Sequence, residues 1–375
     1  MLKKTVFPII LSLALSFFLI EISCYFVFSK FKDRFTFYNV EDYLMKESIL
    51  PKAKKAYHKD YGWMKYYNTP YGERPRHKEF NKPLISFFGD SYTHCDQVGD
   101  NETFQYFLSR KFKADIYNFG VGGFGTDQAY LRFKYDFPKI QTPIVGLGLI
   151  SENINRIVNV YRKFYFQKSE LSLPKPRFKL VNNQLELIPN PLTSESNISL
   201  LQDIKFIDSF GINDYWYNRD NYPKFSFPYS NIILKKRMWL EALANYKKNE
   251  VDDTDPRPWE TLWQNDEARD LMFKIFDSFV LESRDFNSTP VIFLLPQKNE
   301  IYGYYQTGKT IGRDAIMQYC LEKKYYCFDG VQVILENTNS LEEAKKLYNG
   351  HLTKVGNKLI ADGIYKFIND NKLLR

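Results

Sequence analysis

The chain has 375 residues, of which 44% are hydrophobic and 26% charged, a balance typical of a globular protein and unlike that of a disordered one. Its formal charge is +8, but no block of five or more like charges occurs, so the sequence predicts a solvated basic surface and no nucleic-acid partner. The four cysteines form no C-x-x-C pair, which argues against a structural zinc site, and no metal or organic cofactor is expected.

The N-terminal segment is apolar from residue 5 to residue 28, with Glu21 as its only charge. As a helix it spans roughly 36 Å, enough to cross a bilayer. It lacks an A-x-A-like cleavage site, so we interpret residues 1–30 as an uncleaved transmembrane anchor. A lipoprotein alternative would use Cys24, but Glu21 then stands where an aliphatic residue is wanted. The flanking charges are nearly balanced, and we expect the N-terminus inside and the rest of the chain extracytoplasmic, in the periplasm or at the cell surface.

Residues 31–83 are polar and aromatic and are expected to form a membrane-proximal segment with little regular structure of its own. From residue 84 onward, short apolar runs alternate with segments of helical spacing, which predicts an α/β domain with a parallel sheet covered on both faces. An irregular insertion at about 157–262 interrupts the alternation and contains a predicted hairpin around Asn182 and Asn183. The predicted strands are 84–89, 115–119, 143–150, 290–295 and 325–328, and the predicted helices are 101–113, 126–137, 265–285, 310–324 and 353–369.

The remaining cysteines bear on the compartment of this domain. For Cys320 and Cys327 we favour two buried free thiols, and the alternative is a bridge between them if the domain is exported. Cys95 follows a turn that is a candidate for chemistry.

That turn is Gly89-Asp90-Ser91, directly after the first predicted strand. Because chemistry in open α/β sheets lies beyond the carboxyl ends of the strands, the Ser91 hydroxyl would project into the crevice, near the positive end of the next helix. The same residues are also ordinary turn and N-cap composition. The G-x-S-x-G elbow is absent, which argues against the α/β-hydrolase fold.

Two further motifs follow the next two strands. Gly120-Val121-Gly122-Gly123 permits the positive φ and close backbone approach of an oxyanion site, and no acidic ribose partner of a dinucleotide loop is evident. By itself it is a glycine-rich turn. Ser151-Glu152-Asn153 ends the third strand, where the Asn153 amide could donate to an oxyanion.

Histidines are rare in this chain, which has only His58, His77, His94 and His351. His58 and His77 precede the first predicted strand of the sheet, and His94 lies one helical turn from Ser91. His351, in Asn349-Gly350-His351, begins the last helix late in the alternation, so we favour it as a general base over the sheet edge.

These four pieces, in this order, resemble the four motif blocks of the SGNH (GDSL-type) serine esterases, over roughly 84–156 and 288–368. Tyr61-Gly62-Trp63 and Gly72-Glu73-Arg74 are similar to membrane-anchored bacterial members. The resemblance implies a flavodoxin-like three-layer α/β/α fold, the SGNH hydrolase fold, over residues 84–375. It implies Ser91 as nucleophile, His351 as base, no cofactor, and an oxyanion hole made by the Ser91 and Gly123 backbone N–H groups with the Asn153 side chain.

Two departures from the family pattern affect the site. The family usually has an aspartate two or three residues before the histidine, where this chain has Tyr348 and Asn349. We therefore expect a Ser91–His351 dyad helped by Asn349, or by a carboxylate elsewhere in the sequence. In addition, Ser151-Glu152-Asn153 replaces the usual Gly-x-Asn-Asp.

The function expected from this resemblance is cleavage or transfer of acyl groups, such as O-acetyl groups, on extracytoplasmic glycans. One alternative keeps the fold without the chemistry, as a glycan-binding or scaffold component of an envelope complex. Another is a lipid esterase or thioesterase held near acyl chains by the anchor. The sequence gives no oligomeric state.

Overall fold

The computed structural model describes residues 2–30, 40–76, 80–166, 169, 173–217, 225–234 and 259–374. The chain divides into two compact units, each considered by itself below. One comprises Met1–Leu44 and Tyr217–Thr254, and the other comprises Met45–Trp216 and Asp255–Arg375.

The larger unit is built on a sheet of five parallel strands in the order β4-β3-β5-β8-β9. In chain order this is 2-1-3-4-5, the flavodoxin-like arrangement, so the predicted fold class is confirmed. The central strands are apolar and buried on both faces, as the short hydrophobic runs indicated. The strands are β3 (Pro83–Gly89), β4 (Asp115–Gly120), β5 (Ile144–Leu149), β8 (Thr289–Leu294) and β9 (Tyr326–Asp329).

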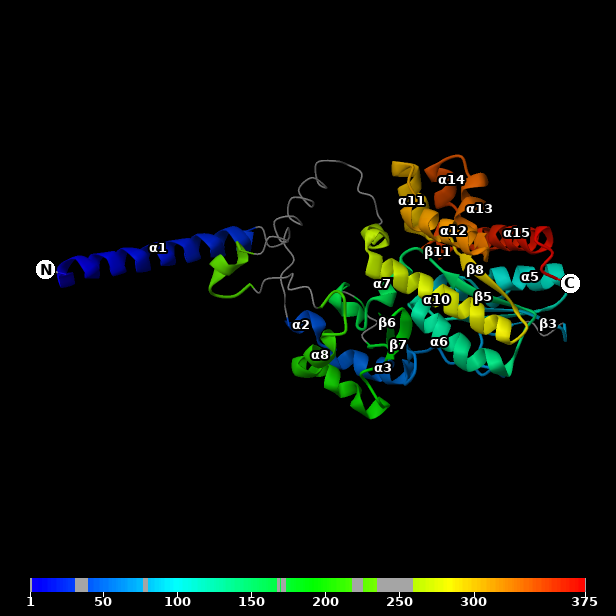
Figure 1. Cartoon of the computed structure of the whole chain (residues 1–375), viewed down its shortest axis with the longest axis horizontal. Coiled ribbons are helices and arrows are strands. Elements are labelled where there is room, and N and C mark those ends of the chain that lie inside the picture. The colour runs from blue at the N-terminus through cyan, green and yellow to red at the C-terminus, as the bar shows by residue number, and fades with distance from the viewer. Residues whose placement is uncertain are drawn as a thin grey trace. The chain divides into compact units, whose positions relative to one another are not determined.

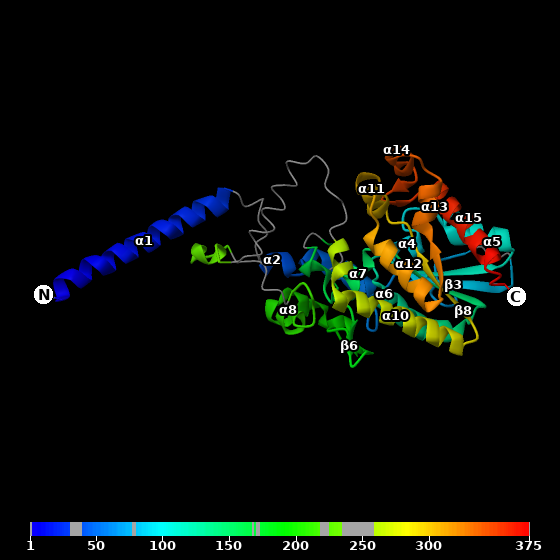
Figure 2. The same ribbon diagram turned by 45° about the horizontal axis from the view of Figure 1, so that its top comes forward.

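Helices cover both faces of this sheet, which makes three layers (Figures 1 and 2). On one face α6 (Thr126–Asp136) and α10 (Asp266–Asp285) pack against the strands and against each other. On the other lie α5 (Phe104–Phe112), α13 (Gly330–Glu336) and α15 (Lys354–Asp370), and α12 (Ile311–Lys323) packs beside β9. Aromatic pairs fill the interior, such as Phe88 and Phe119, whose rings stack with centroids 4.6 Å apart.

The carboxyl end of β3 is where the sheet order reverses, because the next strand pairs on one side of β3 and the following strand on the other. Such a switch point opens a crevice outside the strand ends. The short helix α4 (Ser91–His94) begins there. It packs closely on β4, as shown by the 2.3 Å that would separate a Cβ atom at Gly120 from the backbone nitrogen of His94. Glycine at position 120 therefore permits this approach.

Smaller elements surround the sheet. The segment before it contains α3 (Leu50–Ala56) and a hairpin of β1 (Tyr57–His58) and β2 (Gly62–Trp63). The insertion contains the expected hairpin of β6 (Arg177–Val181) and β7 (Gln184–Ile188), with Asn182 and Asn183 at positive φ. The other elements are α7 (Asn153–Ile157), α8 (Ile204–Gly211), α11 (Lys298–Thr307), α14 (Leu341–Lys345), β10 (Tyr348–Asn349) and β11 (His351–Leu352).

A disulfide joins Cys320 of α12 to Cys327 of β9, with their Cα atoms 6.2 Å apart. The expectation of two free thiols at these positions is therefore wrong, and the bridged alternative is correct. The lysine-rich turn between α12 and β9 reverses the chain, which brings the two side chains face to face. Cys24 and Cys95 are buried and free.

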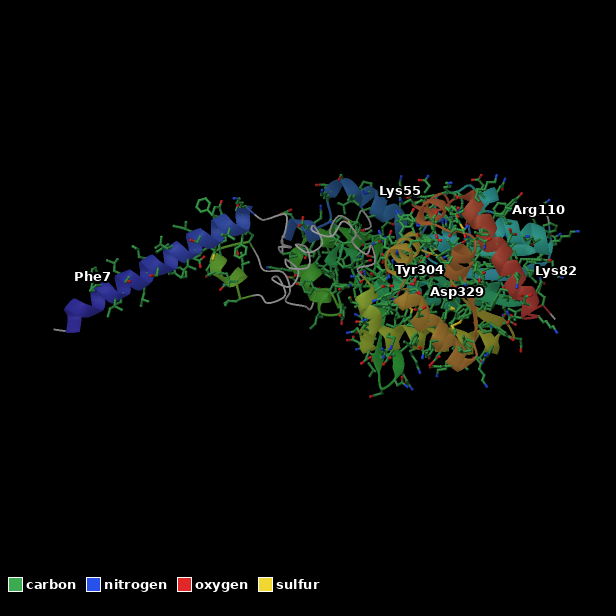
Figure 3. All side chains as sticks on the ribbon, turned by 90° about the horizontal axis from the view of Figure 1, so that it is seen from above. Phe7, Lys55, Lys82, Arg110, Tyr304 and Asp329 are labelled. Atoms are coloured by element: carbon green, nitrogen blue, oxygen red, sulfur yellow. A yellow bond between two sulfur atoms is a disulfide. The ribbon has the colours of Figure 1, made fainter. Side chains whose placement is uncertain are left out.

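The smaller unit contains α1 (Leu2–Lys30) and α2 (Val40–Tyr43). Within α1, residues Phe7–Lys30 have a mean hydropathy of 2.1, so the helix is long and apolar enough to cross a membrane. Side chains project from it on every side in Figure 3, where Phe7 marks its first turns. A signal sequence has the same length and composition, so the uncleaved anchor and the orientation of the chain stay predictions.

Candidate active site

Ser91 and His351 meet at the carboxyl edge of the sheet, although 260 residues separate them in the sequence. The Ser91 Oγ and the His351 Nε2 are 2.8 Å apart, within hydrogen-bond distance. Ser91 is the first residue of α4, directly after β3, and His351 begins β11. The two residues that the sequence singled out as nucleophile and base are thus in direct contact.

Asp90 fixes the turn that presents Ser91. One oxygen of its buried carboxylate accepts a hydrogen bond from the Tyr92 N–H (2.8 Å), and the other accepts one from the Asn153 side-chain amide (2.8 Å). Burial raises the pKa of Asp90, while Arg156 and these hydrogen bonds act in the opposite direction. Asp90 therefore caps the first turn of α4 and is held in place from below the crevice.

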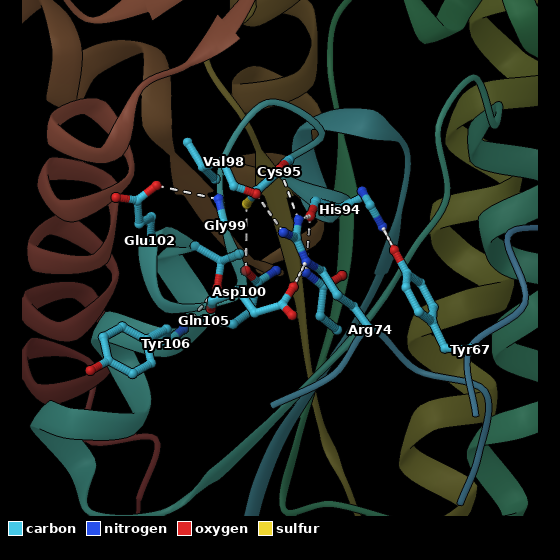
Figure 4. A network of polar contacts seen from close by, with 12 residues as sticks. Tyr67, Arg74, His94, Cys95, Val98, Gly99, Asp100, Glu102, Gln105 and Tyr106 are labelled. Carbon is cyan, nitrogen blue, oxygen red and sulfur yellow. Dashed lines mark hydrogen bonds and ion pairs between the residues drawn. The ribbon is translucent and has the colours of Figure 1, made fainter. Parts of the chain in front are cut away.

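Arg74 braces the other end of the same turn. Its guanidinium donates to the carbonyl oxygens of His94, Cys95 and Val98 and pairs with Asp100 at 2.8 Å, as Figure 4 shows. The sequence drew attention to Gly72-Glu73-Arg74 only as a family resemblance. The structure gives Arg74 a physical role, because four contacts from one rigid, planar group fix the loop that follows the nucleophile.

His351 is oriented by its backbone and by one ring contact. Its N–H donates to the Gln97 side-chain oxygen (2.9 Å), and its ring packs on Tyr92 with centroids 4.7 Å apart. Gly350 has a φ of +76°, and a Cβ atom there would lie 2.4 Å from the Gln97 amide nitrogen. Burial lowers the pKa of His351, although the charges of Asp96 and Asp90 oppose the shift. The imidazole is thus neutral near pH 7, the state that accepts a proton from serine.

The Nδ1 atom of His351 is buried and has no hydrogen-bond partner in the described part of the chain. Asn349, predicted to orient the ring, is exposed on β10, and no bond joins it to the imidazole. Its catalytic role therefore stays a prediction without a supporting contact. Asp329, which ends β9, pairs with Arg313 at 2.7 Å and so is engaged elsewhere.

Asp96 is the carboxylate with the largest electrostatic effect on His351. It lies 2.5 Å from the Nδ1 atom of His94. The Nε2 atom of His94 is 2.6 Å from the Tyr67 hydroxyl, as Figure 4 shows. Burial alone would raise the pKa of Asp96, but the contact with His94 and the charges of His351 and Lys65 lower it. Asp96 is therefore ionised and faces the same cavity as the base.

The predicted oxyanion groups divide into two sets. Ser91 and Gly123 line the cavity, and Gly123 has a φ of +80° in the turn after β4. Among the described residues, no bond occupies the Gly123 N–H. Asn153 is fully buried, donates to Asp90 and does not line the cavity. The structure thus gives Asn153 a bond that the sequence did not predict, and its part in an oxyanion hole stays a prediction.

The cavity beside Ser91 has a volume of about 360 Å³ and is lined mainly by polar side chains. A second hollow, around Arg74 and Tyr106, holds only about 20 Å³, which is room for a single water. Sequence analysis did not identify most of the charged residues lining the larger cavity, because four separate segments contribute them. The i,i+4 spacing of Glu152 and Arg156 is the one sequence signal that could have pointed to any of them. The charged residues that line the larger cavity are Asp96, Glu152, Arg156, Arg162 and Lys298.

No family model and no curated protein matches this chain. Solved structures that are similar include a protein titled as a putative lipolytic protein of the G-D-S-L family from Desulfitobacterium hafniense, with a TM-score of 0.38, 12% identity, and coverage of 76% of this chain and 99% of that one. The psychrotrophic esterase EstA from Pseudoalteromonas has a TM-score of 0.35 and 10% identity, with coverage of 78% of this chain and 99% of that one. The acetyl xylan esterase AlAXEase has a TM-score of 0.36 and 12% identity, with coverage of 76% of this chain and 98% of that one.

The first of these proteins is described as a member of the G-D-S-L family, which the sequence motifs of this chain resemble, and the other two are described as esterases. All three TM-scores are below 0.5. In its motif order, its flavodoxin-like strand order and its Ser91–His351 contact, the chain resembles the SGNH/GDSL esterases.

Proposed function

We propose that this protein is a membrane-anchored serine hydrolase that cleaves esters through an acyl-enzyme on Ser91. The observation that carries the proposal is the 2.8 Å contact between Ser91 Oγ and His351 Nε2 at the wall of a cavity large enough for a small ligand. A neutral histidine within hydrogen-bond reach of a serine at a helix start is the arrangement that activates a hydroxyl.

In the first half of the reaction, the His351 Nε2 atom takes the Ser91 proton as Oγ bonds to the ester carbonyl carbon. The carbonyl electron pair moves to oxygen, where the N–H groups of Ser91 and Gly123 stabilise the negative charge. The tetrahedral intermediate then collapses, and the alcohol leaves with the proton from His351. In the second half, water or an acceptor alcohol gives its proton to His351 and attacks the acyl group, which frees Ser91.

The substrates we propose are O-acetyl or other acyl groups on extracytoplasmic glycans. The polar lining of the cavity suits a sugar better than a long acyl chain. The Cys320–Cys327 bridge agrees with a domain in an oxidising compartment, where such glycans occur. A lipid esterase or thioesterase would want an apolar channel next to the serine.

A second candidate, a glycan-binding protein without hydrolytic activity, is favoured by one observation. His351 Nδ1 has no carboxylate partner in the described part of the chain, so the imidazolium formed during catalysis lacks the usual stabilising contact. The experiment below separates the two candidates.

The test uses the full-length chain in membranes and a fluorophosphonate probe, which bonds only to an activated serine. We expect wild-type labelling, no labelling of Ser91→Ala, and a loss of at least ~10²-fold in rate for His351→Ala, the usual contribution of a general base. His58→Ala serves as a matched control, since His58 stacks on Tyr61 in the β1–β2 hairpin. A folded wild-type protein that resists the probe would overturn the proposal and favour glycan binding, measured then on immobilised acetylated glycans.

A further inference from the structure

The charged side chains of the cavity do not balance one another. Its two carboxylates already have partners, since Asp96 contacts His94 and Glu152 pairs with Arg156 at 3.4 Å. Glu152 also accepts a hydrogen bond from Gln297. Burial opposes ionisation of Glu152, but Arg156 and Arg162 outweigh it and lower its pKa, so both carboxylates are charged and engaged.

Arg156 is engaged as well. Its guanidinium donates to the Phe124 carbonyl oxygen at 2.9 Å and lies 3.8 Å from the Asp90 carboxylate, in addition to its contact with Glu152. Arg156 therefore stabilises the wall of the cavity, and its contacts leave few N–H donors for a ligand.

Arg162 differs from Arg156 in having neither an ion pair nor a carbonyl partner among the described residues, although its guanidinium lies over the Phe166 ring, 5.9 Å from the ring centroid. In the part of the chain that the structure describes, no carboxylate lies within ion-pair distance of its guanidinium, and its Nε atom is buried without a hydrogen-bond partner. Its backbone is well fixed, because the Asp214 carboxylate accepts bonds from the N–H groups of Val160 and Tyr161 just before it. A preorganised guanidinium with free donors is suited to bidentate binding of a carboxylate or phosphate.

Lys298 is the second cation without a partner. Its backbone N–H donates to the Tyr92 hydroxyl at 2.9 Å, which places the first turn of α11 beside the ring that packs on His351. Among the described residues, no carboxylate contacts its ammonium group. Because Lys298 opens a ten-residue helix, the positive end of that helix adds to its charge at the cavity.

We propose that Arg162 and Lys298 form an anion-binding subsite next to Ser91, and that the ester substrate carries a carboxylate or phosphate group close to its acyl group. This inference rests on the proposed hydrolase activity and narrows its substrate class to acylated acidic glycans. The lining of the cavity has three cationic side chains and two carboxylates, so it has a net positive charge beside the nucleophile.

The test compares acetylated polygalacturonate with the same polymer after methyl esterification, which masks its carboxylates and keeps its acetyl groups. An acetylated sugar phosphate forms the phosphate arm. We expect the wild type to favour an anionic ester over the masked one by ~10-fold or more, as charge-assisted hydrogen bonds of this kind confer. The arm that shows the preference identifies the anion.

Arg162→Gln and Lys298→Gln should each lower the ratio of kcat/KM for the anionic over the masked ester by ~10-fold or more, mainly through KM. Lys358→Gln, which removes an exposed cation from α15, is the matched control and should leave the ratio unchanged. Equal rates on masked and anionic esters, with fluorophosphonate labelling intact, would overturn the subsite while leaving the hydrolase proposal standing.

If labelling is absent, the subsite is still tested by titrating oligogalacturonate and inorganic phosphate into Ser91→Ala protein. Saturable binding that Arg162→Gln weakens supports it, and no binding of either anion rejects it.

A separate observation in the smaller unit supports a second inference. Glu21, the only charge within the apolar part of α1, is 3% exposed. Its carboxylate accepts hydrogen bonds from the Tyr229 N–H and from the N–H and hydroxyl of Ser230. A buried carboxylate is costly unless hydrogen-bonded in this way. Residues 225–234 thus pack on α1 at the position of its one charge.

The rest of this contact is apolar. Cys24 and Phe28 of α1 form a buried cluster with Ile232, and the ring of Tyr25 lies 5.2 Å from that of Tyr229. Glu21 lies nine residues before the end of α1, roughly 13 Å along the helix axis. Phe227, Ile233 and Leu234 are exposed by 60%, 45% and 79%, although the Phe227 ring also lies 6.0 Å from that of Phe17 on α1.

We infer that residues 225–234 lie in the interfacial layer of the bilayer beside α1, with Leu234 directed toward the lipid chains. In a Cys24→Ala background, a Leu234→Cys variant in intact vesicles should resist a charged maleimide at least ~10-fold more than Val355→Cys on α15 of the other unit, although Val355 is the less exposed of the two, at 64% against 79%. Detergent should leave Leu234→Cys reactive. Equal reaction rates of the two variants in intact vesicles would overturn the inference.

Discussion

At the scale of single residues, the central question is how a serine–histidine pair works without an adjacent acid. His351 has its Nε2 atom on Ser91 and its Nδ1 atom buried without a partner among the described residues. Asp96 acts on it through space, as an ionised carboxylate held by His94. Through-space stabilisation of the imidazolium is weaker than a direct hydrogen bond, so we expect a functional but modest base.

The pH dependence of labelling follows from the pKa of His351. Burial lowers this pKa below the ordinary histidine value of about 6.5, and the base must be unprotonated to act. The rate of fluorophosphonate labelling should therefore rise with pH, with a midpoint below 6.5, and be level by neutral pH. Labelling measured between pH 4.5 and 8 checks this. A midpoint above 6.5 would show that an acid contacts His351 and raises its pKa.

We expect Asp96→Asn to slow acylation more than Asn349→Ala does, although the sequence pointed to Asn349 as the helper of His351 and not to Asp96. Asp96 raises the pKa of His351 and faces the cavity, so its neutral replacement should slow acylation by on the order of 10²-fold and move the pH midpoint lower. Asn349 is exposed and makes no contact with the ring, so its loss should cost less than about threefold. Single-turnover acylation rates of both variants decide the matter, and a larger loss for Asn349→Ala would restore its predicted role.

At the scale of elements, the turn between β10 and β11 determines where His351 lies. Gly350→Ala places a side chain at a φ of +76° and against the Gln97 amide, which holds the His351 N–H. We expect a loss of about 1 to 2 kcal/mol in stability and a clear drop in labelling rate. Thermal unfolding and labelling measured on the same samples give both quantities.

Gly308→Ala is the matched control for that variant. Gly308 has a φ of +69° at the end of α11, and a Cβ atom at this position would meet nothing within 4 Å, so the backbone strain is alike and the site is untouched. It should lose similar stability and keep its labelling rate. If both variants lose labelling equally, strain alone is responsible and the turn has no special part in placing the base.

The strands and the contact pair were predictable for physical reasons. A strand buried on both faces must be largely apolar, as residues 84–89 are apart from Ser86, and strand ends in a parallel sheet share one edge. For this reason the sequence placed both Ser91 and His351 at the sheet edge, and their side chains are in contact there. It could not assign Asn153 a partner, because the bond to Asp90 depends on side-chain direction within α7. Arg162 and Lys298 are the first residues of a short 3-10 helix and of α11, and the sequence does not indicate that these two helix starts face the same cavity.

The interpretation of Cys320 and Cys327 as free thiols was wrong, since a disulfide joins α12 to β9. The sequence could not decide this, because a spacing of seven residues fits a helix followed by a strand with or without a bridge. Closing a loop of this size should stabilise the folded state by about 2 to 3 kcal/mol. Denaturant unfolding of Cys320→Ala/Cys327→Ala against wild type measures it. Thiol titration of unfolded wild-type protein should find two of the four cysteines reactive, and four would contradict the bridge.

At the scale of the whole molecule, the two units differ in the surroundings that their side chains suit. The larger unit has a buried polar site and a disulfide, whereas the smaller has an apolar helix and a short segment that satisfies its one charge. If α1 is retained as the predicted anchor, the proposed hydrolase would act on substrates close to a membrane surface. The side of the membrane decides which substrates it meets.

The side of the membrane can be tested through the charges that flank α1. Lys3, Lys4 and the terminal amine precede the span, and Lys30, Lys32 and Arg34 follow it, so the loop-charge rule is nearly balanced. We predict the larger unit outside, because its disulfide would not persist in a reducing cytoplasm. Alkaline phosphatase fused after Arg375 should then be active, while green fluorescent protein fused at the same point should be dark.

Charge variants make that prediction sharper. Lys3→Gln/Lys4→Gln removes positive charge from the inner side and should lower phosphatase activity, whereas Lys30→Gln/Lys32→Gln should maintain or raise it. The intact mass of the mature chain shows at the same time whether α1 is retained or removed as a signal. A fluorescent fusion with inactive phosphatase would place Ser91 and the Cys320–Cys327 pair in the cytoplasm. Extracytoplasmic glycans would then be excluded as substrates, and the anionic subsite would have to serve an intracellular ester.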